Sequence, residues 1–157
     1  MTRQENFKPY TQGQERFGEW FIKNVGRLQT RVYEATGGRV WNRFLGVQCA
    51  ILTTTGRKSG QPRKTPLLYL RQGDQVVMVA SKGGMTTLPA WYGNLRANPH
   101  VEIQIGSEKK AYVARDADQD EERLLWPQLD ALYDGYAEYR ARVDGKRRVP
   151  VVIFEPV

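Results

Sequence analysis

The sequence predicts an α+β, mainly β domain in which about six mostly antiparallel strands form a barrel or strongly curled sheet with packed helices. Short apolar or alternating runs separated by turn residues fill the chain from residue 47 to residue 154, and a long amphipathic segment precedes them. The regular strand-helix-strand alternation of a parallel sheet is missing. Because 157 residues with 40% hydrophobic content suffice for one core, we expect a single domain over residues 14–157.

The N-terminal region divides into an arm and a helix. Residues 1–13 are polar, contain Pro9 and Gly13 and show no apolar period, which predicts a mobile arm. Over residues 14–36 apolar side chains recur every three or four positions until Gly37, which predicts an amphipathic helix. Because its basic residues alternate with glutamates, we expect the apolar face to pack on the sheet, with contact to an anionic membrane as the alternative. The residues of this face are Phe17, Trp20, Phe21, Val25, Leu28 and Val32.

The remaining elements follow from changes in period and from turn residues. A helix over residues 89–97 begins at a proline, and later helical segments run from Asp116 or Asp118, through a kink at Pro127, and from Gly135 to about residue 143. The predicted strands cover residues 47–55, 64–71, 75–80, 101–105, 110–115 and 149–154.

The charge is positive and unevenly distributed. The chain carries 24 basic and 17 acidic residues, for a net charge of +7, and residues 49–99 carry seven basic residues against Asp74 alone. Such an excess predicts an anionic partner, which could be a nucleic acid, a membrane surface or a phosphorylated small molecule. Aromatic residues are not interleaved with the basic ones as single-strand binding requires, so we expect no nucleic acid partner.

The small number of histidines and cysteines and the short apolar runs exclude several classes of protein. With only Cys49 and His100, the chain cannot form an internal disulfide, a Cys/His zinc site or a mechanism that needs two histidines, and we expect no metal. The sequence shows neither a charged-then-apolar leader nor a long apolar run. We therefore expect a cytoplasmic protein, with peripheral contact at the inner face of the membrane through the N-terminal helix left open. The sequence does not indicate the oligomeric state.

Two glycine-containing basic turns are candidates for an anion site. Residues 55–60 are not a phosphate-binding P-loop, because the lysine after glycine and the following helix are missing, but flanking glycines let the backbone approach a ligand. A second turn, residues 81–84, also leaves the end of a strand. If the sheet curls, both turns reach one rim, whereas two unrelated hairpin tips are the alternative. The side chains that could hold the anion are Arg57, Lys58, Ser59, Arg63 and Lys82.

Two aromatic groups are candidates for a pocket. One short predicted helix carries Trp91, Tyr92, Asn94 and Leu95. Its apolar face either packs in the core or forms one wall of a pocket for a flat ligand. Phenols spaced by three can hydrogen-bond a carbonyl or donate a proton, and core packing is again the alternative. Gly135 among them disfavours a regular helix and favours a loop at a pocket edge. These phenols are Tyr133, Tyr136 and Tyr139.

Four segments together resemble the deazaflavin-dependent nitroreductase family. They are LTTTGRKSGQPRKTPLLYL (52–70), VASKGG (79–84), PAWYGNLRANP (89–99) and YDGYAEYRARVDGKRRVPVVIFEP (133–156). The resemblance covers residues 40–157 and implies a split β-barrel related to FMN-binding barrels, with the deazaflavin coenzyme F420 as cofactor. It departs from the family at Leu88 and Gly93, where members often carry histidine, and at Leu68, where some carry a pocket tyrosine. These departures concern substrate preference.

The resemblance also implies roles for individual residues. Ser81, Tyr133, Tyr136 and Tyr139 would face the substrate as catalytic residues. The residues implied to bind the coenzyme are Arg57, Lys58, Ser59, Arg63, Lys64, Thr65, Pro66, Leu67, Leu68, Val79, Ala80, Ser81, Lys82, Ala90, Trp91, Tyr92, Gly93, Asn94 and Tyr136.

The expected function is reduction by the reduced coenzyme, F420H2. A hydride would pass to an electron-poor small molecule, such as a conjugated enone, ester, lactone, quinone or nitro compound, while the protein orients and polarises it. A hydroxyl of Tyr133, Tyr136 or Ser81 would hydrogen-bond the substrate oxygen as negative charge builds there. The alternatives are a non-catalytic barrel that holds a lipid or another cofactor and, less favoured, a basic binder of nucleic acid or membrane surfaces.

Overall fold

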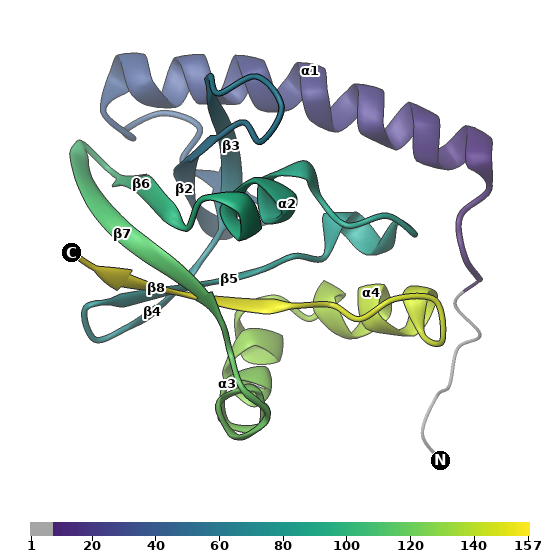
Figure 1. Cartoon of the computed structure of the whole chain (residues 1–157). Helices are drawn as coiled ribbons and strands as arrows, with labels where there is room; N and C mark the ends of the chain where they lie inside the picture. The colour runs from purple at the N-terminus through teal and green to yellow at the C-terminus, as the bar shows by residue number, and fades with distance from the viewer. Residues whose placement is uncertain (1–7) are drawn as a thin grey trace.

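The computed structural model describes residues 8–157 and shows an antiparallel sheet that curls into a half-open barrel (Figure 1). The order of strands is β1-β2-β6-β7-β8-β5-β4, and β3 also pairs with β2. All pairings are antiparallel, as expected. The strands are β1 (Arg43–Phe44), β2 (Val47–Thr55), β3 (Pro62–Leu68), β4 (Leu70–Gln72), β5 (Gln75–Val79), β6 (His100–Ile105), β7 (Glu108–Asp116) and β8 (Val151–Pro156).

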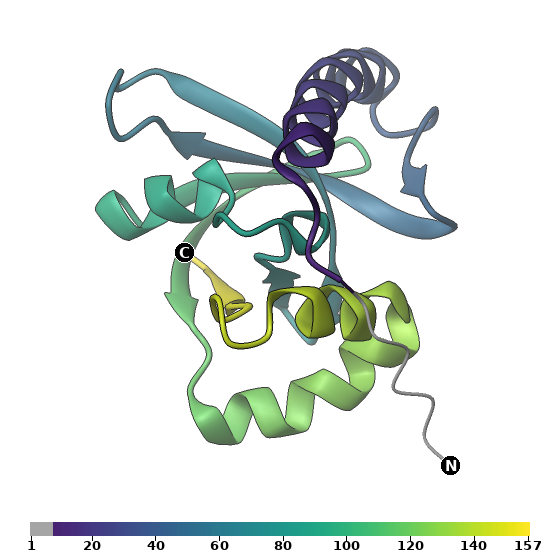
Figure 2. The same cartoon turned by 90° about the vertical axis from the view of Figure 1, so that its right-hand side faces the viewer.

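The helices lie on two sides of this sheet. In Figure 2, α1 is seen nearly end-on above the strands, whereas α3 and α4 lie below them. The predicted helical segments are all present, and Asp118, not Asp116, caps α3, which continues through Pro127. The helices are α1 (Gln12–Thr36), α2 (Ala90–Ala97), α3 (Gln119–Leu132) and α4 (Gly135–Val143), with a short 3₁₀ turn η1 (Lys82–Gly84).

The predicted strand 64–71 is wrong in one respect, because it is two strands separated at Tyr69. β3 pairs with β2 from Pro62 to Leu68, whereas β4 pairs with β5 from Leu70 to Gln72. The chain therefore changes partners at Tyr69, which is a corner of the barrel. The apolar run continues through this corner, so hydrophobic pattern alone gives no sign of the break. The strand β1 was also not predicted, since it has only two residues and both are exposed.

The core consists of two clusters on opposite faces of the sheet. One cluster joins β2, β5, β6, β7 and β8 to α2, and it includes Trp91, Tyr92 and Leu95. The other cluster joins β5 and β8 to α3 and α4 and includes Tyr136. Strands that are buried on both faces explain the continuous apolar runs of β5 and β8 in the sequence.

The helix α1 begins within the segment that was predicted to be an arm. Thr11 caps it, with its hydroxyl accepting from the Gln14 amide at 3.2 Å in a capping box, and Gly37 ends it at φ 60°. Before the helix, the Tyr10 ring lies 4.5 Å from the guanidinium carbon of Arg142. The rest of the predicted arm, residues 1–7, lies outside the described residues.

The face that α1 turns toward the barrel differs from the prediction. Phe17 and Trp20 are 67% and 62% exposed, and Phe21 and Leu28 are exposed as well. The inward face approaches Met85 closely at Gly18, where a Cβ would come within 2.4 Å of the Met85 side chain. Further along the helix, the residues buried on this face are Gln29, Thr30 and Tyr33. The predicted packing of Phe17, Trp20, Phe21 and Leu28 on the sheet is therefore wrong.

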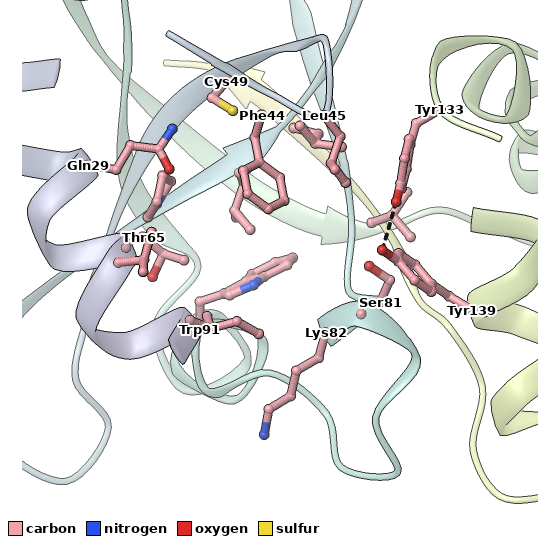
Figure 3. A pocket seen from close by; sticks show the side chains of 18 of the residues that line it. Gln29, Phe44, Leu45, Cys49, Thr65, Ser81, Lys82, Trp91, Tyr133 and Tyr139 are labelled. Carbon is pink, nitrogen blue, oxygen red and sulfur yellow. Dashed lines mark hydrogen bonds between the residues drawn. The ribbon is translucent and has the colours of Figure 1, made fainter. Parts of the chain in front are cut away.

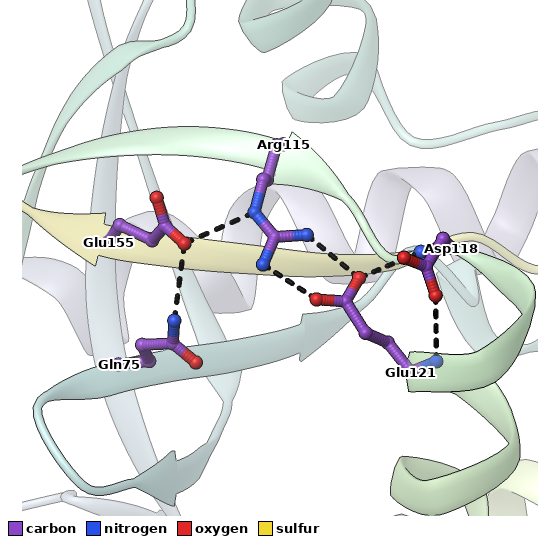
Figure 4. Close-up of polar contacts among 5 residues, drawn as sticks. All are labelled: Gln75, Arg115, Asp118, Glu121 and Glu155. Atoms are coloured by element: carbon purple, nitrogen blue, oxygen red, sulfur yellow. Dashed lines mark hydrogen bonds and ion pairs between the residues drawn. The ribbon is translucent and has the colours of Figure 1, made fainter.

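An ion-pair network fixes the start of α3 to the sheet (Figure 4). Arg115 of β7 donates two hydrogen bonds of 2.7 and 2.8 Å to Glu121 and a third to Glu155 of β8 at 3.2 Å. Glu121 also completes the capping box with Asp118, and these contacts lower its pKa to about 2, with Arg115 as the largest cause. The carboxylate of Glu155 accepts from Gln75 of β5, so the network spans three strands and one helix.

Candidate functional site

A cavity of about 300 Å³ lies between α1, the strands β2, β3 and β5, and the start of α4 (Figure 3). Its wall is largely apolar, and polar groups enter it at a few places. In Figure 3, Trp91 lies on one side, Phe44 on another, and Ser81 stands beside Tyr139. Such a cavity has the size and composition typical of small-molecule sites.

Many of the residues that were expected at the site line this cavity. They come from β3, the end of β5, α2 and the segment around α4: Thr65, Pro66, Leu67, Leu68, Val79, Ser81, Lys82, Trp91, Tyr133, Tyr136 and Tyr139. The structure thus brings together four separate parts of the sequence, as the curled sheet predicts.

One wall of the cavity was missed by sequence reasoning. The sequence predicts that Phe21 and Val25 pack on the sheet and that Gly83 belongs to a basic turn, but it does not predict the other residues as part of a site. The missed residues are Phe21, Ile22, Val25, Gly26, Gln29, Phe44, Leu45, Cys49 and Gly83. The only signal at this wall was Gly26 inside the amphipathic helix. A Cβ there would lie 3.7 Å from Pro66 of β3, an ordinary contact distance, so the glycine marks the contact without being required by it.

The three tyrosines form one cluster at the cavity. The hydroxyls of Tyr133 and Tyr139 share a hydrogen bond of 2.7 Å, and the rings of Tyr133 and Tyr136 meet edge to face at 5.1 Å. Burial raises the pKa of Tyr136 and Tyr139 above the ordinary value, so these phenols stay protonated at neutral pH. They can therefore act as hydrogen-bond donors.

Gly135 has a packing role that differs from the predicted loop. It is the first residue of α4, and a Cβ there would come within 2.3 Å of the Tyr133 ring. The predicted break in the helix is present, because α3 ends at Leu132 and Tyr133 has an extended backbone, but Gly135 itself belongs to α4 and not to the connecting loop. The glycine is needed so that Tyr133 can fold back against the helix that carries Tyr136 and Tyr139.

The turn after β5 presents a cation and a hydroxyl to the cavity. Lys82 has φ 45°, in the left-handed region that few residues other than glycine adopt. The Lys82 side chain is only 19% exposed, and its ammonium lies 2.7 Å from the carboxylate of Glu19 of α1 and 2.8 Å from the hydroxyl of Thr87. Ser81 is buried beside it. This turn is the part of the predicted anion site that reaches the cavity directly.

The other basic turn is attached to α2. The guanidinium of Arg57 donates to the Ala90 carbonyl and the Asn94 side chain, both at 3.2 Å, and the Arg57 amide donates to Asn94 at 3.1 Å. A Cβ on Gly93 would lie 2.8 Å from the Arg57 guanidinium, so glycine leaves the room that this contact needs. Trp91 of the same helix lines the cavity, and α2 therefore connects the turn to the cavity wall.

The remaining expected residues lie around this turn or in the core. Arg63 donates to the Ser59 hydroxyl at 3.2 Å, and Lys64 pairs with Glu34 of α1 at 2.5 Å. The Tyr92 hydroxyl donates to Asp116, which makes Tyr92 a core residue with a satisfied polar tip. The expected coenzyme residues outside the cavity wall are Arg57, Lys58, Ser59, Arg63, Lys64, Ala80, Ala90, Tyr92, Gly93 and Asn94.

A curled antiparallel sheet with an apolar cavity, a bordering tryptophan and a cation at its edge defines a split-barrel cofactor-binding protein. The sequence model of the F420H2-dependent quinone reductase family matches residues 25–156. The F420H2-dependent quinone reductase Rv1261c of Mycobacterium tuberculosis is 39% identical over 143 residues, which cover 86% of this chain and 95% of that relative. The chain therefore belongs to the F420H2-dependent quinone reductase family, whose cofactor is coenzyme F420.

Solved structures agree with this assignment. An F420H2-dependent reductase, FDR-A, matches with a TM-score of 0.63 and 39% identity over 68% of this chain and 93% of that one. A second structure, described as a domain-swapped dimer, matches with a TM-score of 0.66 and 34% identity over 87% of this chain and 98% of that one. The expected resemblance to deazaflavin-dependent enzymes, the split-barrel fold and the class of F420-dependent oxidoreductase are thereby confirmed.

Proposed function

We propose that the cavity binds reduced F420 and that the protein transfers its hydride to a quinone or another conjugated, electron-poor small molecule. The observation that carries this proposal is the meeting of Trp91, Lys82 and three phenols at one mostly apolar cavity. A flat heterocycle fits between apolar walls, and an anionic tail suits a rim with an excess of cations. The residues present therefore fit the coenzyme.

The bound coenzyme supplies the hydride, and the side chains of the chain orient the reactants. Trp91 provides an extended flat wall, while the apolar residues of α1 and β3 exclude water from the cavity. The substrate oxygen gains negative charge as the hydride arrives, and hydroxyl donors stabilise that charge. We assign this donation to Ser81, Tyr133 and Tyr139, which line the cavity.

The paired tyrosines fit this role for a simple reason. Two phenols that share one hydrogen bond hold two protons, of which one bridges the oxygens at 2.7 Å and the other is free to point elsewhere. The free proton of the Tyr133–Tyr139 pair is the donor that we assign to the substrate oxygen. The buried Tyr136 keeps the pair in place through its ring contacts.

We also propose that the coenzyme tail leaves the cavity along the β2–β3 turn. Lys58 and Arg63 are exposed there, and Arg57 is already fixed to α2. Lys82 would bind the end of the tail that is nearest the ring. The order of contact from cavity to surface would thus be Lys82, then Arg63 and Lys58.

Binding and turnover test the function separately. Titration of purified protein into oxidised F420 should change the fluorescence of the coenzyme, and absence of binding would overturn the proposal. With F420H2, oxidation should be faster with a soluble naphthoquinone than with a cyclic enone or a nitroimidazole. Binding without oxidation of F420H2 by any acceptor would favour the non-catalytic alternative.

The outer face of α1 supports a proposal on location. Among residues 8–157, no helix is long and apolar enough to cross a membrane. Phe17, Trp20 and Leu28 are nevertheless exposed on a helix that also carries Arg16 and Lys23. We propose a cytoplasmic protein whose α1 touches the inner face of the membrane, where hydrophobic quinones dissolve.

Vesicles distinguish this contact from self-association. The protein should sediment with vesicles that contain anionic lipid, and Phe17→Ser/Trp20→Ser should reduce this by about tenfold, since each exposed aromatic side chain contributes apolar area. The single substitution Leu124→Ser, at a similarly exposed leucine of α3, serves as the control. A concentration-dependent dimer without vesicle binding would show that α1 covers a second copy instead.

A further inference from the structure

Arg147 makes an unusual set of contacts behind the turn that follows β5. Its Nε donates to the Met85 carbonyl at 2.9 Å, and its Nη2 donates to the Ser81 carbonyl at 2.6 Å. Its Nη1 donates to the carbonyls of Ala80 and Arg148 at 3.1 and 3.0 Å. One guanidinium therefore holds three carbonyl groups from the segment 80–85 together, at positions that are distant from Arg147 in the sequence.

The segment that Arg147 holds has a conformation that needs support. Lys82, Gly83 and Gly84 have φ values of 45°, 62° and 79°, so three successive residues lie in the left-handed region. Only two backbone hydrogen bonds close the turn, from Gly84 to Ser81 at 2.9 Å and from Met85 to Lys82 at 3.2 Å. Non-glycine residues keep such a conformation only where their surroundings fix it, and they concentrate at functional sites.

The opposite side of the same turn faces the cavity. Ser81, Lys82 and Gly83 all line it. A change in the backbone dihedral angles of Ser81 or Lys82 would redirect the side chains that these two residues contribute to the cavity wall. The four acceptors of Arg147 are neutral carbonyl groups. The guanidinium therefore fixes the geometry of the turn, and its positive charge is not neutralised by these acceptors.

We infer that Arg147 is a positioning residue for the coenzyme: it fixes the Ala80–Met85 backbone so that Ser81 and Lys82 face the cavity. This inference rests on the proposed function of the cavity. Arg147 acts through the turn and does not itself line the cavity wall. A lysine cannot replace it, because one ammonium group lacks the planar fork that reaches carbonyls on two sides.

Arg147→Lys and Arg147→Gln test the inference, with Arg148→Gln as the matched control. Arg148 belongs to the same basic run, but its side chain is 59% exposed and lies 3.6 Å from Glu122. Hydrogen exchange without coenzyme should become faster at the amides of Gly84 and Met85 in both Arg147 variants and stay unchanged in the control. Affinity for oxidised F420 should fall about 10- to 100-fold in both, which is the range expected for lost hydrogen bonds to a charged group.

Lys82→Gln supplies a readout that a general loss of stability would not give. If Arg147 acts by placing Lys82, the loss of F420 affinity that Arg147→Gln causes should be several-fold smaller in the Lys82→Gln background than in the wild-type background. Fully additive losses would overturn the inference, and so would wild-type affinity in Arg147→Lys, because charge alone would then suffice. If the wild type itself does not bind F420, the proposed function fails, whereas unchanged exchange at Gly84 and Met85 refutes the role of Arg147 independently.

Discussion

The ammonium of Lys82 lies 2.7 Å from the carboxylate of Glu19, and this ion pair joins α1 to the turn that borders the cavity. A second acid strengthens the junction: Glu15 accepts from the Thr86 amide at 2.7 Å and from its hydroxyl at 2.9 Å. The amide hydrogen bond is the largest cause of the lowered pKa of Glu15. The helix that closes one side of the cavity is therefore fixed to the cation that we assign to the coenzyme.

Glu19→Gln should strengthen coenzyme binding. The carboxylate of Glu19 neutralises Lys82, so an anionic group of the coenzyme competes with it for the ammonium. Removal of one half-exposed charge should raise the affinity for F420 about two- to fivefold at low salt, and less at high salt. Fluorescence titration at two ionic strengths measures this.

Glu108→Gln is the control for Glu19→Gln, since Glu108 pairs with Lys110 at 3.2 Å on the β6–β7 hairpin. It removes the same charge from an exposed lysine pair and should leave the affinity unchanged. Weaker binding in Glu19→Gln would contradict competition and would show that Glu19 holds Lys82 in its binding position.

Lys58→Ala/Arg63→Ala should weaken coenzyme binding strongly. If both side chains contact the anionic tail, the loss of two charge-assisted contacts costs on the order of 3 kcal/mol, or about a hundredfold in affinity. Lys109→Ala/Lys110→Ala removes the same charge from another hairpin and should have little effect. Equal affinity in the two double variants would move the tail to a different surface.

The fold was largely predictable, because most strands and helices carry their own periodicity and turn residues. The break at Tyr69 was not, since it depends on which strand each half of the run pairs with, and both halves are apolar. The packed face of α1 was also not predictable from periodicity. Two stripes compete on that helix, and the one that packs inward carries Gly18, Gln29 and Tyr33 in place of the large apolar side chains.

The candidate site was predicted in part, for related reasons. Motif resemblance identified the turn at Ser81, the tryptophan of α2 and the three tyrosines, all of which line the cavity. Arg147 lies in a run of three basic residues that is typical of a solvated surface, so its contacts with backbone carbonyls had no signal in the sequence. Contacts to backbone depend on the path of a distant segment, which local pattern does not encode.

Glu121→Gln should remove a contribution to the stability of the fold that the wild type has at neutral pH and loses at acid pH. The folded-state pKa of Glu121 is lowered to about 2 from 4.5, chiefly by Arg115. A lowered pKa means that this group stabilises the fold above pH 4.5 and that the contribution is lost as the pH falls toward 2. Thermal melts of the wild type and the variant should therefore differ most near pH 7 and converge near pH 2.

Glu122→Gln is the matched control for Glu121→Gln, because Glu122 also lies in the first turn of α3 but has only a 3.6 Å contact to Arg148. Its melting temperature should follow that of the wild type more closely at every pH. A constant difference between Glu121→Gln and the wild type from pH 7 to pH 2 would contradict the role of ionised Glu121.

Tyr133→Phe and Tyr139→Phe should lower turnover without lowering coenzyme affinity. Each substitution keeps the ring and removes one member of the hydroxyl pair that is joined at 2.7 Å. The remaining hydroxyl loses its partner, so the donor to the substrate oxygen is no longer held in place. Steady-state oxidation of F420H2 by a soluble quinone should fall roughly tenfold to a thousandfold, the range for loss of a donor to a developing oxyanion.

The same tyrosines could instead be core residues with polar tips, and three measurements separate the two roles. A packing role predicts a lower melting temperature with intact turnover, whereas a donor role predicts intact melting and F420 binding with reduced turnover. Tyr112 is a buried tyrosine of β7 in the other core cluster. The variant Tyr112→Phe controls for the loss of a phenol elsewhere in the fold and should leave turnover unchanged. Because burial raises the pKa of Tyr139, a donor role of Tyr139 also predicts that the turnover rate shows no loss from ionisation of this phenol up to about pH 10. Full activity in Tyr133→Phe, Tyr139→Phe and their combination would remove the pair from the mechanism and leave Ser81 as the donor to test next.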